Sequence, residues 1–215
     1  MDTTPERVIA YIDGFNLYYG MKDSGWRRYY WLNPESLVRK FLNGRQLCGV
    51  KFFTSQVTEP IDKKNRQKAY LDALSTLPLV QTMLGRYELK PWTCYGCKQT
   101  VVIPKEKMSD VRLATELLID AFYDAFDTAY IISGDSDLVP PIQYVRQVFP
   151  KKAVGVISPP KRVSAELRAA STWSAVIGRA TLASSQFPNE IARPSGHSLH
   201  RPLKWGGVPV AVTQP

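Results

Sequence analysis

The sequence predicts an α/β fold built around a mainly parallel sheet. Short runs of apolar residues alternate along the chain with longer segments in which apolar residues recur at helical spacing. Such alternation is typical of βαβ units, whose crossover helices cover both faces of a parallel sheet. The chain has 215 residues, 44% of them hydrophobic, which is enough for one substantial domain.

Local signals predict the individual strands and helices. The helix at 109–126 is the strongest, because apolar residues such as Leu118 and Ala121 recur at helical spacing. Asn33 and Pro34 suit the N-cap and the first position of another helix. The expected strands are 7–12, 50–54, 80–84, 129–132, 153–157 and a short last one at 172–177. The expected helices are 14–21, 34–42, 62–77, 109–126, 138–149 and 163–170.

We expect the strand order 3-2-1-4-5, which makes the first and fourth strands neighbours where the order reverses. Residues 90–107 interrupt the alternation of strands and helices. This segment contains Cys94, Cys97 and a short apolar run at 101–103. It is therefore predicted to be a small hairpin inserted before the helix at 109.

The pattern of strands and helices ends near residue 184. The remaining segment contains five prolines, three glycines and few apolar residues, a composition typical of chains without a packed core. We therefore predict a domain at 1–183 and a flexible, Pro-rich basic tail at 184–215, either disordered or draped over the domain.

The chain is strongly basic, with a net charge of +9 and a pI near 9.5. An excess of positive charge favours an anionic partner, and nucleic acid is the first candidate. A soluble basic protein with a solvated Lys/Arg surface is the alternative, and charge alone does not separate the two.

The cysteine count and the hydropathy pattern predict a cytoplasmic protein. Three cysteines, an odd number in a chain of this length, do not suit a disulfide framework. The first residues lack the basic and apolar regions of a signal peptide. No apolar run approaches the length of a membrane span.

Histidine is nearly absent, which limits the kinds of active site that the domain can contain. The two histidines are His197 and His200, and the first 196 residues contain none. This argues against a Ser-His-Asp triad, a Cys-His dyad or a His-based metal centre in the body of the fold. Chemistry there must rest on carboxylates, Lys, Tyr, Cys or a metal bound through oxygen.

Carboxylates follow two strands that are expected to be neighbours. Asp13 follows the first strand, and Asp135 and Asp137 follow the fourth. Asp110 begins the helix that leads into the fourth strand, and Glu116 is a weaker candidate further along that helix. We expect the aspartates to meet where the strands end, in an oxygen-only site that suits Mg²⁺ or Mn²⁺. The alternative is that they are ordinary turn and N-cap residues.

Two basic segments are candidates for nucleic-acid binding. Arg27 and Arg28 precede Tyr29, Tyr30 and Trp31, a mixture of cations and aromatic rings that suits a single strand. Aromatic side chains near a helix are more often part of the core. The second segment is the start of the helix at 62–77, which carries Lys63, Lys64 and Arg66.

The spacing of Cys94 and Cys97 is that of half a zinc knuckle. Cys48 could supply a third ligand, and His197 and His200 could supply two from the tail. A reduced turn with two thiols is the alternative to a structural Zn²⁺ site. A thioredoxin-like redox role does not fit, because the motif does not open a helix after a strand.

Three motifs carry a resemblance to a known family. DGFN at 13–16, MSDVRLATELL at 108–118 and SGDSDLVPPI at 133–142 are together similar to the NYN domain. The NYN domain is a branch of the PIN-like ribonucleases, and the chain resembles its bacterial LabA-like members from residue 7 to 177. The resemblance implies a PIN-like three-layer α/β/α sandwich and Mg²⁺- or Mn²⁺-dependent cleavage of RNA.

The resemblance also implies roles for individual residues. The acidic cluster that holds the metal would be Asp13, Asp110, Asp135 and Asp137. Asn16 would orient an aspartate or a metal-bound water, and Ser133 would support the loop. Glu116 stands where many relatives have Asp, so its role is open.

The favoured function is a metal-dependent endoribonuclease that prefers single-stranded RNA. The alternative is an RNA-binding or regulatory protein with the same fold and little or no cleavage. A phosphatase with Asp13 as nucleophile is a third class, but it would ordinarily want a second acid at position 15, which is Phe15. The sequence leaves open a homodimer.

Overall fold

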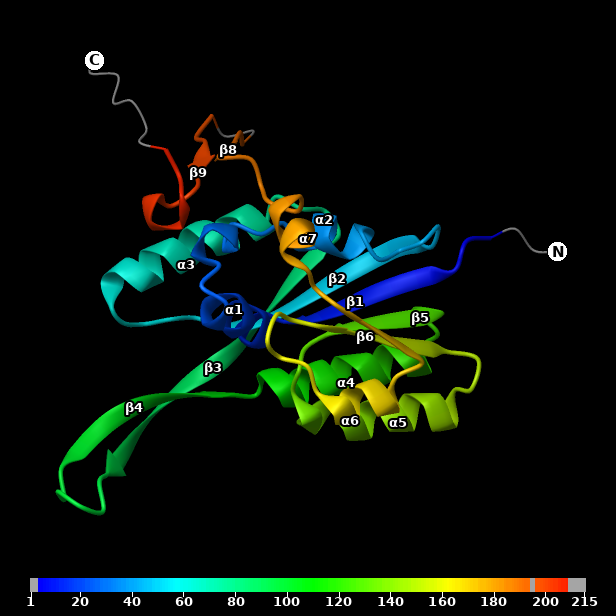
Figure 1. Ribbon diagram of the computed structural model, residues 1–215, viewed down its shortest axis with the longest axis horizontal. Helices are drawn as coiled ribbons and strands as arrows, with labels where there is room; N and C mark the ends of the chain where they lie inside the picture. Colours follow the sequence, from blue (N-terminus) through cyan, green and yellow to red (C-terminus); the bar gives the residue numbers. More distant parts are fainter. Residues whose placement is uncertain (1–3, 194–195, 209–215) are drawn as a thin grey trace.

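The computed structural model describes residues 4–193 and 196–208 of the chain. In this part of the chain, a seven-stranded sheet lies between two layers of helices (Figure 1). Its strands are β1 (Arg7–Asp13), β2 (Gln46–Ser55), β3 (Val80–Thr93), β4 (Thr100–Lys107), β5 (Thr128–Ile132), β6 (Ala153–Ser158) and β7 (Trp173–Val176). The helices are α1 (Gly14–Asp23), α2 (Pro34–Arg39), α3 (Ile61–Leu74), α4 (Ser109–Phe122), α5 (Val139–Val148), α6 (Ala165–Ala170) and α7 (Arg179–Ala183). Shorter elements are η1 (Arg27–Tyr29), η2 (Ser136–Leu138), η3 (Leu203–Trp205), β8 (Glu190–Ile191) and β9 (Leu199–His200).

The strand order is β4-β3-β2-β1-β5-β6-β7. The first five strands expected from the sequence are β1, β2, β3, β5 and β6, and the predicted order 3-2-1-4-5 is confirmed; the short last strand expected at 172–177 is β7. β1 pairs in parallel with both β2 and β5, and β6 and β7 extend the parallel sheet. All parallel strands therefore end at one edge of the sheet, the carboxyl edge, and begin at the opposite amino edge.

Alternation along β1 divides the core between the two faces of the sheet. Val8, Ala10 and Ile12 belong to the cluster covered by α1, α2 and α3. Ile9 and Tyr11 belong to the second cluster, which α4, α5 and α6 cover. Successive side chains of a strand point to opposite faces. This burial on both faces gives the α/β/α sandwich that the resemblance implied.

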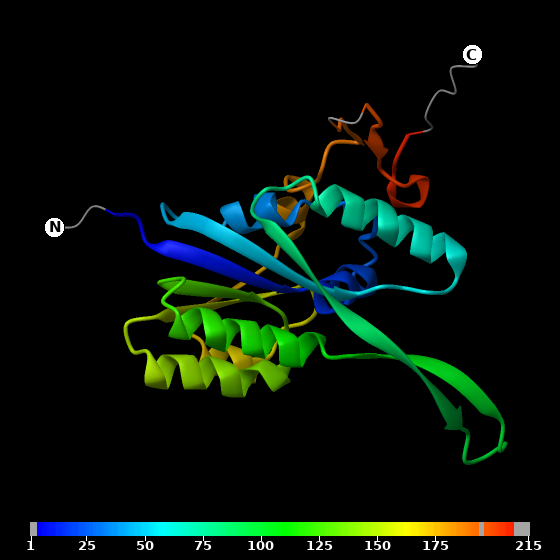
Figure 2. The same cartoon turned by 180° about the vertical axis from the view of Figure 1, so that it is seen from behind.

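The hairpin expected at 90–107 is longer than predicted. β3 does not end at Leu84 but continues to Thr93, and its outer half pairs with the antiparallel β4. The two strands leave the body as a ribbon, which we call the arm (Figure 1, Figure 2). The arm is thus a continuation of a core strand rather than a separate insertion, because no break interrupts β3.

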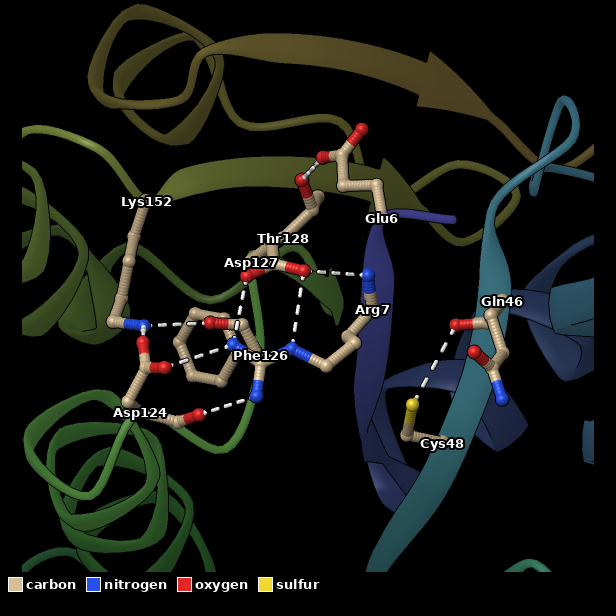
Figure 3. Close-up of polar contacts among 9 residues, drawn as sticks. All are labelled: Glu6, Arg7, Gln46, Cys48, Asp124, Phe126, Asp127, Thr128 and Lys152. Atoms are coloured by element: carbon tan, nitrogen blue, oxygen red, sulfur yellow. Dashed lines mark hydrogen bonds and ion pairs between the residues drawn. The ribbon is translucent and has the colours of Figure 1, made fainter. Parts of the chain in front are cut away.

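Ion pairs join the strands at the amino edge (Figure 3). Arg7 at the start of β1 hydrogen-bonds Asp127, which precedes β5, and also pairs with Asp124. Lys152, which precedes β6, donates to Asp124 and to the carbonyl of Phe126. Hydrogen bonds to Asp127 and Asp124 raise the pKa of Arg7. These ion pairs hold the strands together at the amino edge. We therefore expect a functional site at the carboxyl edge.

The tail is draped over the domain for as far as the structure describes it. Phe187 is buried in the first core cluster, and the indole N–H of Trp31 donates to the carbonyl of Pro188 at 2.8 Å. Trp205 packs against Trp31 and Tyr70, with centroid distances of 6.4 and 6.2 Å. Of the two forms considered for the tail, residues 184–193 and 196–208 adopt the draped one, because their few apolar side chains find partners in the domain. The rest of the expected tail lies outside the described residues.

Among the described residues, no helix is both long and apolar enough to cross a bilayer.

Candidate active site at the carboxyl edge

Asp13 is the last residue of β1 and the N-cap of α1. Its Oδ1 accepts a hydrogen bond from the backbone N–H of Asn16 at 2.9 Å, as N-cap carboxylates do. The next residue must be small, because a Cβ at Gly14 would lie 2.7 Å from the carbonyl oxygen of Phe53. The DGFN motif therefore turns the chain tightly from strand to helix and leaves Asp13 in a buried position.

Hydrogen bonds join the end of β1 to the loop after β5. Ser133 donates through its hydroxyl to Oδ2 of Asp13 at 3.0 Å and accepts from the backbone N–H of Asp135 at 3.1 Å. Asn16 accepts from the backbone N–H of Gly134 through its side-chain oxygen at 3.0 Å. Ser133 and Asn16 thus hydrogen-bond across the two acidic segments.

Burial and nearby charge perturb the titration of Asp13. Burial raises the pKa of Asp13 to about 6. The hydrogen bonds from Asn16 and Ser133 oppose the rise, whereas the charges of Asp110 and Asp135 add to it. This mutual repulsion shows that carboxylates from β1, α4 and the loop after β5 lie near one another. We call Asp13, Asp110 and Asp135 the aspartate cluster.

The four predicted ligands are not equivalent. Asp110 lies in the first turn of α4, and Asp135 caps η2 by accepting from the N–H of Asp137 at 3.0 Å. Asp137 is exposed and contributes that N–H from the same loop. Within residues 4–193 and 196–208, no three Asp, Glu, Cys or His side chains are arranged closely enough to hold a metal ion. The aspartate cluster is therefore not a closed metal site among the described residues.

Glu116 lies away from the aspartate cluster. It pairs with Lys51 at 2.8 Å, and Lys51 also pairs with Asp120 at 2.6 Å. Asp120 accepts from the hydroxyl of Tyr11 at 2.6 Å. Burial lowers the pKa of Lys51, but hydrogen bonds to Asp120 and Glu116 raise it by more. Glu116 is thus a member of an ion network between α4 and the sheet.

The loop after β6 closes over the motif loops and was missed by sequence reasoning. A Cβ at Gly134 would lie 2.0 Å from the carbonyl oxygen of Arg162, and one at Gly20 would lie 2.7 Å from that of Pro160. Arg162 itself pairs with Asp23 at the end of α1. These close approaches explain why both positions are glycine, and they bring the backbone of Arg162 beside the motif loop. Only the two glycines could have signalled this contact in the sequence.

Ser158, at the end of β6, was also missed. Its side chain is fully buried, and its hydroxyl has no hydrogen-bond partner among the described residues. Ser158 lies two residues after Val156, which forms the last β5–β6 pair with Ile131. It therefore lies at the carboxyl edge, beside the end of β5. A buried hydroxyl without a partner is costly, and no sequence signal distinguishes it from other serines.

The tail connects the two predicted basic segments. Arg27 and Arg28 are exposed on η1, and Lys63 and Lys64 are exposed at the start of α3, where Arg66 is partly buried. Arg201 in the tail donates to the carbonyl of Arg28, and Lys204 pairs with Asp62 at 3.0 Å. We call Arg27, Arg28, Lys63, Lys64 and Arg66 the basic surface. The aromatic residues Tyr29, Tyr30 and Trp31 are buried, so they belong to the core and not to a stacking surface.

Comparison with known proteins identifies the family. The NYN domain family model matches residues 7–176. The chain is 27% identical, over 254 residues, to 6-hydroxy-3-succinoylpyridine 3-monooxygenase HspA of Pseudomonas putida, a match that covers 97% of this chain and 78% of the relative.

A solved structure shares the fold. It is a protein of unknown function, VPA0982, from Vibrio parahaemolyticus RIMD 2210633, with a TM-score of 0.59 and 16% identity. The match covers 87% of this chain and 99% of that one. Taken with the motif geometry at the carboxyl edge, the family match shows that the chain belongs to the NYN domain family, within the PIN-like ribonuclease superfamily.

Proposed function

We propose that this protein is a Mg²⁺- or Mn²⁺-dependent endoribonuclease that prefers single-stranded RNA. The observation that carries the proposal is the buried carboxylate of Asp13, whose pKa is raised to about 6 beside Asp110 and Asp135. Carboxylates held together in this way are costly unless protons or cations compensate. The NYN family match supports a nuclease as the class of enzyme.

The donor set fits a hard divalent cation. Asp13, Asp110, Asp135 and Asp137 offer only oxygen donors, the ligands that Mg²⁺ and Mn²⁺ prefer. When bound, such a cation would activate water and neutralise charge on a phosphodiester. Asp135 and Asp137 would complete the set by a small movement of the η2 loop, since Asp137 is exposed.

The chain's own residues have separate tasks in this proposal. Ser133 and Asn16 hold the two acidic segments together, so that Asp13 and Asp135 keep their orientation. Without a metal, burial raises the pKa of Asp13 to about 6, so a cation that binds this carboxylate competes with a proton. The basic surface and Arg162 bind the phosphates of the RNA strand, which attracts it to the carboxyl edge.

Labelled single-stranded RNA tests the proposal directly. We expect cleavage with Mn²⁺ or Mg²⁺ and none with EDTA. Asp13→Asn and Asp110→Asn should each abolish cleavage while the fold and RNA binding persist, and Glu190→Gln, an exposed tail position, should leave cleavage unchanged. Cleavage that survives both aspartate substitutions would reject the proposal.

RNA binding without efficient cleavage is the second candidate. The observation that favours it is the absence of a complete metal ligand set among the described residues. In that case the same RNA should bind with a strong salt dependence, and no product should form at any concentration of Mn²⁺ or Mg²⁺. The two outcomes are read from one gel, because bound and cleaved RNA migrate differently.

The relative from Pseudomonas putida introduces a third candidate, oxygenation of a hydroxylated pyridine. The similarity favours it because it covers 97% of this chain. A monooxygenase consumes O₂ together with two electrons from a donor. Oxidation of a reduced nicotinamide, with or without flavin, in the presence of 6-hydroxy-3-succinoylpyridine would support this candidate.

A further inference from the structure

The tip of the arm is a turn that carries two cysteines. Cys94 directly follows the outgoing strand, which ends at Thr93, and Cys97 lies in the turn before β4 begins at Thr100. Both thiols are free, and Cys97 is exposed. The arm holds this turn away from the helices and the rest of the sheet (Figure 1, Figure 2). No part of the proposed nuclease site uses it.

The backbone of the turn is shaped around the sulfur of Cys94. The N–H of Cys94 donates to the carbonyl of Gln99 and the N–H of Lys98 donates to the carbonyl of Cys94, both at 2.9 Å. Lys98 has a φ of 58°, an uncommon conformation for a residue with a side chain. A Cβ at Gly96 would lie 3.9 Å from the sulfur of Cys94, so the thiol lies close to the backbone of the turn. Thiolates are the form in which cysteine binds metals.

The pair supplies half of a tetrahedral Zn²⁺ site, which needs four ligands. Cys48 does not complete it, because it lies on β2 beside Gln46 at the amino edge (Figure 3). His200 is in β9, which lies against α3. Among the described residues, no group of three metal-binding side chains exists anywhere. The missing ligands must therefore come from another molecule.

We propose that the arms of two copies of this chain meet tip to tip and bind one Zn²⁺ through Cys94 and Cys97 of each copy. A second copy is the simplest source of the missing ligands, because a twofold axis through the metal supplies an identical pair. Four thiolates around Zn²⁺ complete the tetrahedral coordination of a structural site. This assignment does not depend on whether the protein cleaves RNA.

The surroundings of the cysteines fit a self-association site. Trp92, Tyr95 and Val101 leave 49%, 90% and 48% of their surface exposed, an unusual concentration of apolar side chains for the end of a ribbon. A second arm would cover them. Zn²⁺ with four thiolates carries two negative charges, and Lys98 from each copy would offset them.

The test uses the full chain purified under reducing conditions with added Zn²⁺. Elemental analysis should find one zinc for every two chains, and light scattering should find dimers that a strong chelator converts to monomers. Co²⁺ in place of Zn²⁺ should give the visible spectrum of tetrahedral thiolate coordination. Cys94→Ser and Cys97→Ser should lose both zinc and dimer, whereas Cys48→Ser should retain both.

Other outcomes would overturn the assignment. One zinc per monomeric chain would mean that a single chain supplies the ligands. Dimers that resist chelation, or that form only without reductant, would mean that zinc does not hold the copies together. The serine variants should unfold at the same temperature as the wild type, since the turn lies outside the core. This measurement separates loss of zinc from loss of fold.

Discussion

The hydroxyl of Ser133 lies 3.0 Å from Oδ2 of Asp13 and donates a hydrogen bond to it, with both side chains buried. This contact joins the ends of β1 and β5, two strands that are neighbours in the sheet but far apart in the sequence. It also stabilises the charged form of Asp13, because it lowers the pKa of a carboxyl group that burial raises.

Replacing Ser133 by Ala should therefore move the pH profile of RNA cleavage. Burial raises the pKa of metal-free Asp13 to about 6, so at a limiting concentration of Mn²⁺ we expect activity to rise with pH, with a midpoint set by competition between the metal and a proton. Loss of a hydrogen bond worth about 1 kcal/mol would raise that midpoint by roughly 0.7 pH units. Cleavage rates from pH 5 to 8 measure the shift, and Ser136→Ala in the same loop serves as the control. An unmoved midpoint would mean that Asp13 is not the group that titrates.

Stability should depend on pH through Asp13 as well. The folded-state pKa of Asp13, about 6, lies above the ordinary value of 3.8. The folded protein therefore holds a proton that the unfolded chain has lost, and this contribution to stability disappears as the pH rises from about 4 to 6. In the metal-free protein, Asp13→Asn should be more stable than the wild type at pH 7 by up to about 3 kcal/mol. Urea unfolding with EDTA at pH 4.5 and pH 7 measures the difference, which should be smaller at the lower pH.

Two substitutions at Asp135 separate its charge from its capping bond. Asparagine can still accept the N–H of Asp137 that Asp135 accepts at 3.0 Å, whereas alanine cannot. Asp135→Asn should abolish cleavage and leave the metal-free protein as stable or more stable, because repulsion with Asp13 disappears. Asp135→Ala should cost about 1 kcal/mol through the lost cap.

Thermal unfolding with and without Mg²⁺ completes that comparison. Excess Mg²⁺ should stabilise the wild type by linkage and both variants much less. An Asp135→Asn protein that melts lower, responds normally to Mg²⁺ and still cuts RNA would leave Asp135 with a structural role alone.

The network around Lys51 should matter for stability more than for catalysis. Lys51 is mostly buried and is shared by Glu116 and Asp120. Lys51→Ala should destabilise the fold by roughly 3 kcal/mol, because two mostly buried carboxylates lose their cation. Combining Lys51→Met with Glu116→Gln and Asp120→Asn should recover most of the loss. Urea unfolding of the single and triple variants decides this, and if the triple variant were no more stable than Lys51→Ala, unpaired charge would not be the cause.

The basic surface makes a prediction about salt. Lys63 and Lys64 are both exposed at the start of α3. If both contact phosphates, Lys63→Ala with Lys64→Ala should flatten the slope of log affinity against log salt by roughly 1.4 for single-stranded RNA. Lys40→Ala with Lys151→Ala removes the same charge from exposed positions outside the basic surface and should change the slope little. Equal slopes for the two double variants would exclude this end of α3 from the interface.

The sequence predicted those features that depend on local patterns. Apolar runs followed by small and acidic residues fixed where β1 and β5 end, and their pairing then brings Asp13 and Asp135 together. The continuation of β3 into the arm was missed, because nothing local marks where a strand leaves the body of a sheet.

Contacts between distant segments were beyond prediction for a different reason. The pairing of Lys51 with Glu116 and Asp120 depends on which face of α4 meets β2. The approach of the Arg162 carbonyl to Gly134 depends on the path of the loop after β6. In the same way, the composition of the tail does not indicate that Trp205 packs against Trp31 and Tyr70.

The draped tail makes the packed domain longer than the segment that the family model matches. The family match stops at residue 176, but Leu182 and Phe187 belong to the same apolar core as Trp31. The N–H of Asn33 donates to the carbonyl of Ser185 at 2.8 Å, so the capped start of α2 also depends on it. A fragment that ends at residue 176 would expose the rings of Trp31 and Tyr70. It would also leave the indole N–H of Trp31 without its acceptor, the carbonyl of Pro188.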